Sequence, residues 1–280
     1  MKTVIITGST DGIGKQTALI LAQKGFFVLI HGRNEEKCRQ TVNEISSATG
    51  SKNLDYFACD LLSLKEVRRF SEEVKKRYEA LDVLINNAGV YLKDYILSQE
   101  GIEGTFQINH LSMFYLTLNL LPIIKTAKEE HARIINVSST AHASKMDFDN
   151  LVKPLKYDGH RAYSLSKLCN ILFTLELSEK LQDKNITVNC LHPGVINTKL
   201  LKAGWGAVGG FFGKSIQEGA TTSVYLATSK DAENITGKYF SDSKIAKPHD
   251  IVYDKNIRAE LWRMSEELIV KFENLKKMSD

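Results

Sequence analysis

The sequence predicts an α/β fold with a doubly wound parallel sheet of about seven strands and helices on both faces. Short β-branched runs alternate with longer helical patterns, which is typical of strands joined by right-handed helical crossovers. Runs such as Val83–Asn86 and Arg133–Val137 are almost wholly apolar, which favours a sheet covered on both faces. The 280 residues, 43% of them hydrophobic, can bury one large core, so we expect a single domain over residues 1–280.

The elements are expected in alternating order along the chain. The predicted strands are Thr3–Thr7, Phe26–His31, Leu54–Ala58, Val83–Asn86, Arg133–Val137 and Thr187–Leu191. The predicted helices are Gly14–Lys24, Glu35–Ser46, Leu64–Tyr78, Gly101–Lys125, Arg161–Gln182 and Ile257–Phe272.

The alternation loosens after Leu191, where five of the ten residues 204–213 are glycine. Ligands of such sheets bind beyond the carboxyl ends of the strands, so we expect substrate-side loops at about 140–160 and 195–215. We interpret the glycine-rich segment as a lid over the substrate, with an ordinary surface loop as the alternative.

Composition narrows the class of protein. The net charge of +4 comes from basic residues interspersed with acidic ones, which predicts no nucleic-acid partner. No apolar run is long enough for a signal peptide or a membrane span. The widely spaced cysteines predict neither a metal site nor a disulfide framework, so we expect a cytoplasmic protein. They are Cys38, Cys59, Cys169 and Cys190.

A glycine-rich turn joins the first predicted strand to the first helix. Thr7 is followed by Gly8-Ser9-Thr10-Asp11-Gly12-Ile13-Gly14, and the helical pattern begins at once. Glycines allow a backbone to approach a pyrophosphate closely, and the N–H groups and dipole of a helix start stabilise its charge. Glycines also make plain turns, but this position between strand and helix predicts a dinucleotide site.

The end of the second strand indicates which dinucleotide is bound. An NAD site normally presents an acidic side chain there to the ribose 2′-hydroxyl, whereas this chain has Arg33. A guanidinium can bind the 2′-phosphate of NADP(H) through two hydrogen bonds, and Lys15 could add a second positive charge. The alternative is that both are solvated surface cations beside Glu35 and Glu36. We predict NADP(H).

Tyr163 and Lys167 stand four residues apart in a predicted helix, so they share one face. A nearby ammonium favours phenolate, and we expect it to lower the pKa of the tyrosine toward the range of a general acid or base. Ser139 ends a predicted strand and could hold a substrate oxygen, with Ser138 as its competitor. Asn109 could bond to backbone or to a water leading from Lys167, or be an ordinary buried asparagine.

These motifs, in this order, resemble the short-chain dehydrogenase/reductase family over nearly the whole chain. Besides the glycine turn, they are Asp60, Asn86-Asn87-Ala88-Gly89, Asn109, Ser139, Tyr163-Ser164-Leu165-Ser166-Lys167, and Pro193-Gly194 with Thr198. The resemblance implies a Rossmann fold and a catalytic set of Asn109, Ser139, Tyr163 and Lys167. It also implies a cofactor site made of Gly8, Thr10, Gly12, Ile13, Gly14, Arg33, Asp60, Leu61, Asn87, Ala88, Gly89, Tyr163, Lys167, Pro193, Val195 and Thr198.

Within the family, the chain is most similar to the retinol-dehydrogenase-like branch. The signs are Gly14-Lys15, the Gly-Arg end of the second strand, residues 136–142 (NVSSTAH), the 24-residue interval from Ser139 to Tyr163, and residues 236–240 (TGKYF). Membrane-bound relatives have an amino-terminal hydrophobic segment, whereas the first strand here begins at Thr3, so we expect no membrane span. Family resemblance also predicts a homodimer or homotetramer, associated through the helices around Asn109 and Tyr163.

The function expected from these features is hydride transfer between NADP(H) and an apolar aldehyde, ketone or retinoid-like alcohol. Largely apolar residues after strand ends or in the longer loops are candidates to line the substrate pocket. They are Val90, Tyr91, His142, Met146, Phe148, His192, Trp205, Phe211 and Phe212. Two alternatives are a binding protein that senses NADP(H) without turnover, and reduction of a C=C bond as in protochlorophyllide reductases.

Overall fold

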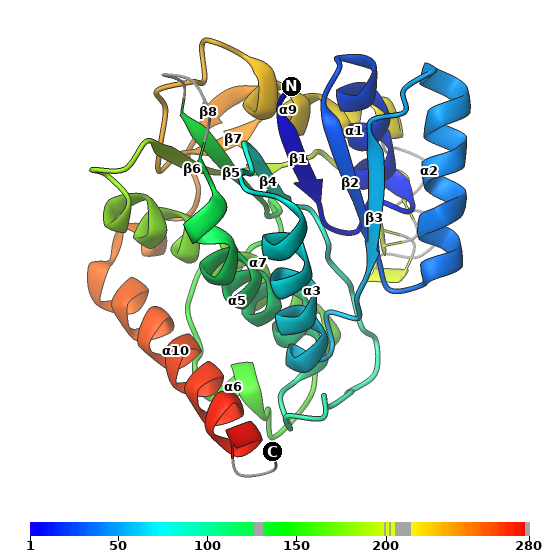
Figure 1. The fold of residues 1–280 in the computed structure, drawn as a ribbon. Coiled ribbons are helices and arrows are strands. Elements are labelled where there is room, and N and C mark those ends of the chain that lie inside the picture. The colour runs from blue at the N-terminus through cyan, green and yellow to red at the C-terminus, as the bar shows by residue number, and fades with distance from the viewer. Residues whose placement is uncertain (126–130, 199, 202, 205–213, 278–280) are drawn as a thin grey trace.

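The computed structural model describes residues 1–125, 131–198, 200–201, 203–204 and 214–277, and its strands form one sheet (Figure 1). The strands are β1 (Thr3–Ile6), β2 (Phe27–Gly32), β3 (Leu54–Ala58), β4 (Val83–Asn86), β5 (Ala132–Val137), β6 (Ile186–His192), β7 (Tyr239–Ser241) and β8 (Lys244–Ala246). Their order is β3-β2-β1-β4-β5-β6-β7-β8. The predicted doubly wound parallel sheet is confirmed, and β8 extends it by one short antiparallel edge strand.

Helices cover both faces of this sheet (Figure 1). They are α1 (Gly12–Gln23), α2 (Glu35–Thr49), α3 (Leu64–Arg77), α4 (Gly104–Phe106), the π-helix η1 (Gln107–Leu111), α5 (Ser112–Leu120), α6 (Asp149–Val152), α7 (Gly159–Lys180), α9 (Ile216–Thr228) and α10 (Lys255–Lys277). Two short 3₁₀ turns are η2 (Leu121–Ile123) and η3 (Asp250–Tyr253).

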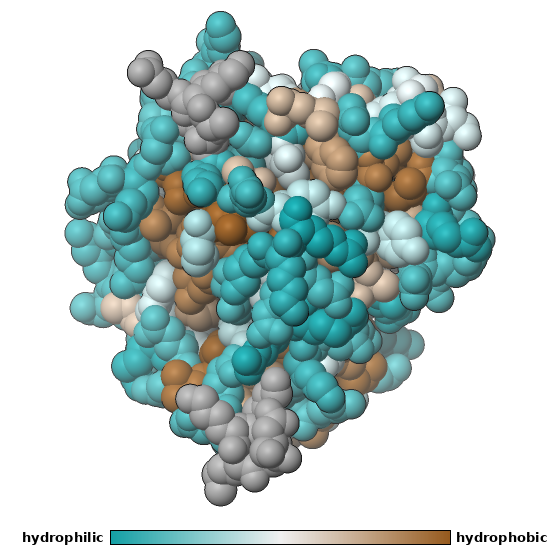
Figure 2. All heavy atoms as spheres, in the orientation of Figure 1, coloured by the Kyte–Doolittle hydropathy of each residue, from teal (hydrophilic) through white to brown (hydrophobic). Residues whose placement is uncertain are grey.

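The alternation of side chains along each strand divides the core in two. In β1, Val4 and Ile6 point to the cluster beneath α1, α2 and α9, whereas Ile5 points to the cluster beneath α3, α5, α7 and α10. Val28 and Leu29 of β2 divide in the same way. Polar residues cover most of the face seen in Figure 2, and apolar side chains show between them. Both faces of the sheet are therefore buried, as its apolar strands predict.

One predicted helix differs from its expectation in a way that affects the site. The segment expected as a helix over Gly101–Lys125 becomes helical only at Gly104, and its next turn is the π-helix Gln107–Leu111. The preceding residues instead form a turn, which is closed by the antiparallel bridge between Leu97 and Glu103 and by the hydrogen bond from the Gly101 N–H to the Ser98 carbonyl. A π turn has one residue more than an α turn, and here it contains Asn109.

The carboxyl-terminal helix α10 packs along α5 and α7. The ring of Trp262 lies 5.0 Å from the ring of Phe114 and 5.9 Å from that of Phe173, between centroids. Tyr115 of α5 meets Phe272 of α10 edge to face. These aromatic contacts bury the outer surface of α5 and α7 within the chain itself.

The structure also shows the state of the cysteines and the character of the helices. Its four cysteines are buried and unpaired. Over the described ranges, no helix combines the length and the apolar character that crossing a bilayer requires.

Candidate active site

The carboxyl ends of the parallel strands open into two adjoining cavities of about 560 and 320 Å³. They lie where the strand order reverses between β1 and β4, which is where open α/β sheets bind ligands. The larger is lined by Gly8, Thr10, Gly12, Ile13, Gly14, Arg33, Asp60, Leu61, Asn87, Ala88, Gly89 and Thr198, among others. The smaller is lined by Ser139, Tyr163, Lys167, Pro193 and Val195, among others. The structure thus brings the residues predicted for the cofactor site together.

The glycine turn is shaped for close approach of a ligand to the backbone. Gly8 and Gly12 have φ angles of +63° and +55°, a region that side chains disfavour. A Cβ at Gly14 would overlap the Gly8 carbonyl oxygen and the Asn87 amide nitrogen. The turn leads directly into the amino terminus of α1, which has no acidic residue in its first turn. A pyrophosphate fits this cradle of backbone N–H groups.

Side chains from neighbouring strand ends fix the turn. The Thr7 hydroxyl accepts hydrogen bonds from the N–H groups of Asn87 and Ala88, each at 3.0 Å. The Asn87 side-chain amide donates to the carbonyls of Thr7 and Gly8, at 2.8 and 3.1 Å. The cradle is therefore tied to the end of β4 before any ligand arrives.

His31 also holds the turn, a role that the sequence analysis missed. Its Nδ1 accepts the Gly8 N–H at 3.1 Å, and its Nε2 lies 3.2 Å from the Cys59 carbonyl oxygen. Burial lowers the pKa of His31 to about 4, so the ring is neutral and Nε2 carries the proton. The available signal was a histidine at a strand end facing a glycine-rich turn.

The two cations predicted near the cofactor are placed differently. Arg33 lines the larger cavity, next to Gly32 at the end of β2. Lys15 instead forms an ion pair with Glu44 of α2 and is not among the residues that line that cavity. Only Arg33 is therefore positioned to meet a phosphate in the cavity.

Asp60 lies at the cavity edge just after β3. Its Oδ1 accepts the Leu62 N–H at 2.9 Å, and its own N–H donates to Glu66 of α3 at 2.7 Å. These bonds fix the carboxyl group beside Leu61 on the cavity wall.

The smaller cavity is lined by three of the four predicted catalytic residues, Ser139, Tyr163 and Lys167, whereas Asn109 does not line it. Tyr163 and Lys167 project from the same face of α7, with the Lys167 Nζ 5.6 Å from the centre of the Tyr163 ring. The Lys167 ammonium donates to the Val137 carbonyl oxygen at 3.1 Å. Both side chains are almost fully buried, at 5% and 2% exposure, so the cavity holds a phenol and an amine away from bulk water.

Burial is the largest cause of the pKa shifts of both Tyr163 and Lys167. It raises the pKa of Tyr163 to about 12, although a hydrogen bond with Ser139 acts in the opposite direction. It lowers the pKa of Lys167 to about 8. In the protein alone the pKa of Tyr163 is thus shifted upward, opposite to the expected direction, because desolvation of the phenolate outweighs the hydrogen bond from Ser139. At neutral pH the tyrosine carries its proton.

The two candidate serines at the end of β5 have different partners. The Ser138 hydroxyl donates to the Lys167 carbonyl oxygen at 2.7 Å and so ties β5 to α7. The Ser139 hydroxyl bonds to Tyr163 and accepts the Ala141 N–H at 3.1 Å. Only the Ser139 hydroxyl therefore adjoins the phenol, where a substrate oxygen would lie.

Asn109 bonds to backbone, which is one of the alternatives left open by the sequence. Its Oδ1 accepts the Val90 N–H at 2.7 Å, while its amide donates to the Val90 carbonyl at 2.9 Å and to Ser166 at 3.0 Å. This holds the chain beside Gly89, where a Cβ would come within 3.1 Å of the Lys167 Nζ. Asn109 thus shapes the wall on which Lys167 rests.

The predicted substrate residues are only partly brought together. His192 lines the smaller cavity, and Val90 lines the larger one. Met146 and Phe148 instead pack against the core, and Tyr91 packs beside Tyr163 with 6.0 Å between ring centroids. His142 is absent from the cavity lining, and Trp205, Phe211 and Phe212 lie outside the described residues.

Part of the apolar lining of the smaller cavity was not predicted from the sequence. Ile196, Leu200 and Leu201 line it, together with Ile13, Val137 and Val195. Their position directly after the sixth strand was the available signal.

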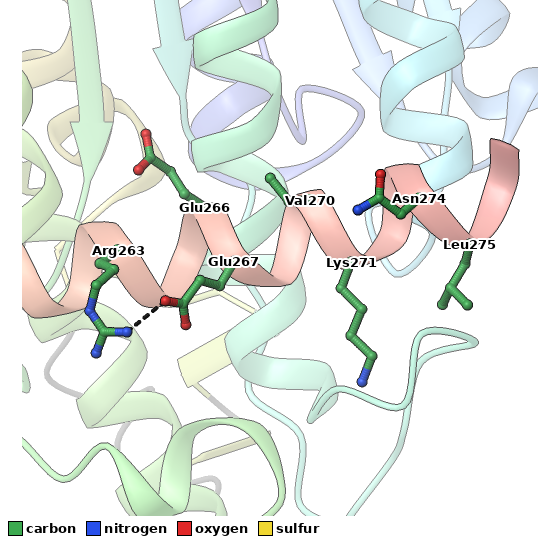
Figure 3. Close-up of a pocket in the computed structure, with 7 residues that line it drawn as sticks. All are labelled: Arg263, Glu266, Glu267, Val270, Lys271, Asn274 and Leu275. Atoms are coloured by element: carbon green, nitrogen blue, oxygen red, sulfur yellow. Dashed lines mark hydrogen bonds and ion pairs between the residues drawn. The ribbon is translucent and has the colours of Figure 1, made fainter.

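Another hollow lies on the outer face of α10, apart from this site (Figure 3). All its lining residues come from that one helix: Arg263, Glu266, Glu267, Val270, Lys271, Asn274 and Leu275. Arg263 and Glu267 form an exposed ion pair at 2.6 Å, drawn as the dashed line. The side chains of one helix do not enclose a ligand, so the chemistry belongs to the two cavities at the sheet edge.

Comparison with known proteins agrees with this geometry. The model of the short chain dehydrogenase family matches residues 2–205. The chain belongs to this family. Mouse retinol dehydrogenase 13 is 40% identical to this short-chain dehydrogenase, covering 96% of this chain and 84% of that protein. The chloroplastic short-chain dehydrogenase TIC 32 A of Brassica napus is 37% identical, covering 95% and 88%.

Solved structures give the same result. A protein from Mycobacterium paratuberculosis has a TM-score of 0.79 and 29% identity, covering 96% of this chain and 93% of that one. A short chain dehydrogenase from Shigella flexneri, complexed with NADP, has a TM-score of 0.71 and 25% identity, covering 87% and 97%. This short-chain dehydrogenase is therefore an oxidoreductase of the retinol-dehydrogenase-like kind, in a family that uses NAD(H) or NADP(H).

Proposed function

We propose that this short-chain dehydrogenase transfers a hydride between NADP(H) and an apolar aldehyde, ketone or retinoid-like substrate, with Tyr163 as the general acid or base. The observation that carries the proposal is the meeting of Ser139, Tyr163 and Lys167 in one cavity beside the glycine cradle. The apolar side chains of that cavity support a substrate with little charge.

The protein groups have separate tasks at the reacting carbonyl. The Ser139 hydroxyl donates to the substrate oxygen and holds it next to the Tyr163 hydroxyl, which supplies the proton as the carbonyl becomes an alcohol. Lys167 stabilises the resulting phenolate from the same face of α7. When bound, the nicotinamide supplies the hydride for reduction and accepts it for oxidation. A tyrosine protonated at neutral pH favours reduction.

Arg33 supports the choice of NADP(H). It lines the larger cavity at the end of β2, and no described carboxylate forms an ion pair with it. A planar guanidinium matches a phosphate group with two hydrogen bonds. Related structures hold NADP, including the one from Shigella flexneri.

The decisive experiment compares the wild type with Tyr163→Phe. NADPH consumption is followed with retinals, aliphatic and aromatic aldehydes, steroids and quinones. We expect turnover of apolar carbonyls by the wild type and a loss of about 10²- to 10⁴-fold in kcat for the variant, because the proton donor is gone. NADPH affinity, measured by fluorescence titration, should be unchanged. Full turnover by Tyr163→Phe would remove Tyr163 from the mechanism.

The cofactor preference is tested with Arg33→Ala. Loss of hydrogen bonds to a charged phosphate should weaken NADPH binding by about 10- to 100-fold and leave NADH binding almost unchanged. Arg39→Ala is the matched control, because the Arg39 guanidinium pairs with Glu36 on the surface of α2. Equal NADPH affinity in Arg33→Ala and Arg39→Ala would refute the role given to Arg33.

A further inference from the structure

The backbone of Ser139 is held by a histidine that lies behind the cavity. The Ser139 carbonyl oxygen receives two hydrogen bonds from His142, one from its backbone N–H at 3.3 Å and one from its ring Nδ1 at 2.7 Å. Ser138, Ser139, Thr140 and Ala141 line the cavity, whereas His142 does not. The imidazole therefore reaches the cavity through its hydrogen bond to Ser139.

The opposite side of the ring fixes its protonation. Nε2 of His142 faces the backbone N–H of His249 at 3.2 Å. A backbone N–H can only donate, so Nε2 has to be the acceptor and the proton has to be on Nδ1. Nδ1 then donates to the Ser139 carbonyl, which can only accept. Both ring contacts thus define one neutral tautomer.

Packing keeps the ring in this position. His142 is 8% exposed, and its ring lies 4.7 Å from the ring of His249 and 5.7 Å from that of Tyr239, between centroids. Burial lowers the pKa of His142, which keeps the ring uncharged at neutral pH.

The partner on the far side comes from a distant part of the chain. His249 follows β8 and directly precedes η3, beyond residues 2–205, which the family model matches. The ring of His142 therefore joins the end of β5 to the carboxyl-terminal region.

We propose that His142 is a positioning residue that holds Ser139 in its catalytic place through its Nδ1–H and anchors it to the backbone at His249. The inference rests on the proposed function of Ser139. The bond from Nδ1 to Ser139 supports turnover, and the bond from the His249 N–H to Nε2 attaches the carboxyl-terminal region.

Two amide variants separate these bonds. In His142→Asn the amide lies where Nδ1 was and can still donate to the Ser139 carbonyl. In His142→Gln the amide lies where Nε2 was and can accept the His249 N–H. The Asn and Gln side chains are both neutral amides, and both leave part of the volume of the imidazole ring empty. Thermal unfolding should therefore show similar losses of stability in the two variants. His142→Ala removes both bonds.

Activity is measured with the best carbonyl of the substrate panel. We expect kcat of His142→Asn to stay within about fivefold of wild type, and kcat of His142→Gln and His142→Ala to fall by about tenfold or more, because Ser139 loses a buried hydrogen bond. The KM for NADPH should be the same in all variants. Equal kcat in the Asn and Gln variants, or a loss that follows thermal stability alone, would overturn the inference.

A second measurement does not depend on turnover. Nitrogen NMR of the wild-type protein should show a protonated Nδ1 and an unprotonated Nε2 on His142, and a proton on Nε2 would overturn the inference. A wild type that binds NADPH but reduces no carbonyl of the panel would instead refute the proposed function. The two failures are therefore distinguishable.

Discussion

The two cavities at the sheet edge are built in different ways. The larger is shaped by backbone, with glycines at positive φ, a Gly14 that has no room for a side chain, and strand ends joined by Thr7 and Asn87. The smaller is shaped by side chains, with an apolar lining into which the polar groups of Tyr163 and Lys167 extend from α7.

This difference separates binding from chemistry. A backbone cradle presents N–H groups that a side-chain substitution other than proline leaves in place, so such a substitution affects it mainly by altering its shape. A cavity lined by functional side chains keeps its shape when one polar atom is removed, but it loses the chemistry of that atom. Substitutions in the first region should act on cofactor affinity, and those in the second on kcat.

Within the second region, the largest effect expected after that of Tyr163→Phe is the effect of Ser139→Ala. Loss of the hydroxyl next to Tyr163 should lower kcat by about 10²- to 10³-fold, as for other donors to a developing oxyanion, with NADPH affinity unchanged. Ser138→Ala is the matched variant, because its hydroxyl bonds to the Lys167 carbonyl instead. It should cost about 1 kcal/mol in the free energy of unfolding. Steady-state kinetics measures the loss of kcat, and denaturant titration measures the loss of stability. A larger loss of kcat in Ser138→Ala than in Ser139→Ala would show that Ser138 is the catalytic serine.

The next largest effect is expected for Gly14→Ala in the first region. The added methyl group would push Gly8 and Asn87 apart, and overpacking of this kind should weaken NADPH binding by about 10- to 100-fold. Gly50→Ala is the control, because Gly50 at the end of α2 has φ +71° but no atom within 4 Å of an added Cβ. It should cost about 1 kcal/mol of stability and leave NADPH affinity intact. Titration calorimetry measures the NADPH affinity of both variants. A Gly14→Ala protein that binds NADPH normally but turns over slowly would contradict the assignment of cofactor binding to the backbone cradle.

The last prediction is a difference in pH dependence between the two directions of reaction. Reduction uses the protonated phenol, which burial preserves to high pH, so its kcat should be flat between about pH 6 and 8. Oxidation uses the phenolate, so its kcat should rise about tenfold for each pH unit over the same window. Above about pH 8 the amine of Lys167 loses its proton, and with it the charge that stabilises phenolate. Oxidation that is independent of pH would show that another group accepts the proton.

The fold and most of the site were predictable because strong local signals carry them. Apolar strands alternating with helices determine the sheet, and the glycine turn is recognised by its place between β1 and α1. The helix α9 was missed, although Ser215 and Glu218 form a capping box at its start. The hairpin of β7 and β8 was missed because its strands have only three residues each and its turn residues Asp242 and Ser243 adopt positive φ without glycine.

What remained unpredictable depends on three-dimensional contacts. The pKa of Tyr163 follows from burial, which spacing along a helix does not reveal. The difference between Ser138 and Ser139 depends on which hydroxyl meets the Tyr163 phenol and which meets the Lys167 carbonyl. The pairing of Lys15 with Glu44 joins residues 29 positions apart. The role of His31 likewise requires the ends of β1, β2 and β3 to lie side by side.

The packing of α10 on α5 and α7 has a consequence for the behaviour of the protein on dilution. Sequence resemblance predicts that subunits associate through the helices around Asn109 and Tyr163. Within the chain, the ring of Trp262 packs against the rings of Phe114 and Phe173. A contact made within one chain has an effective concentration set by covalent linkage and does not weaken as the protein is diluted. The contact of α10 with α5 and with α7, the helix that carries Tyr163 and Lys167, therefore stabilises these helices equally at any protein concentration.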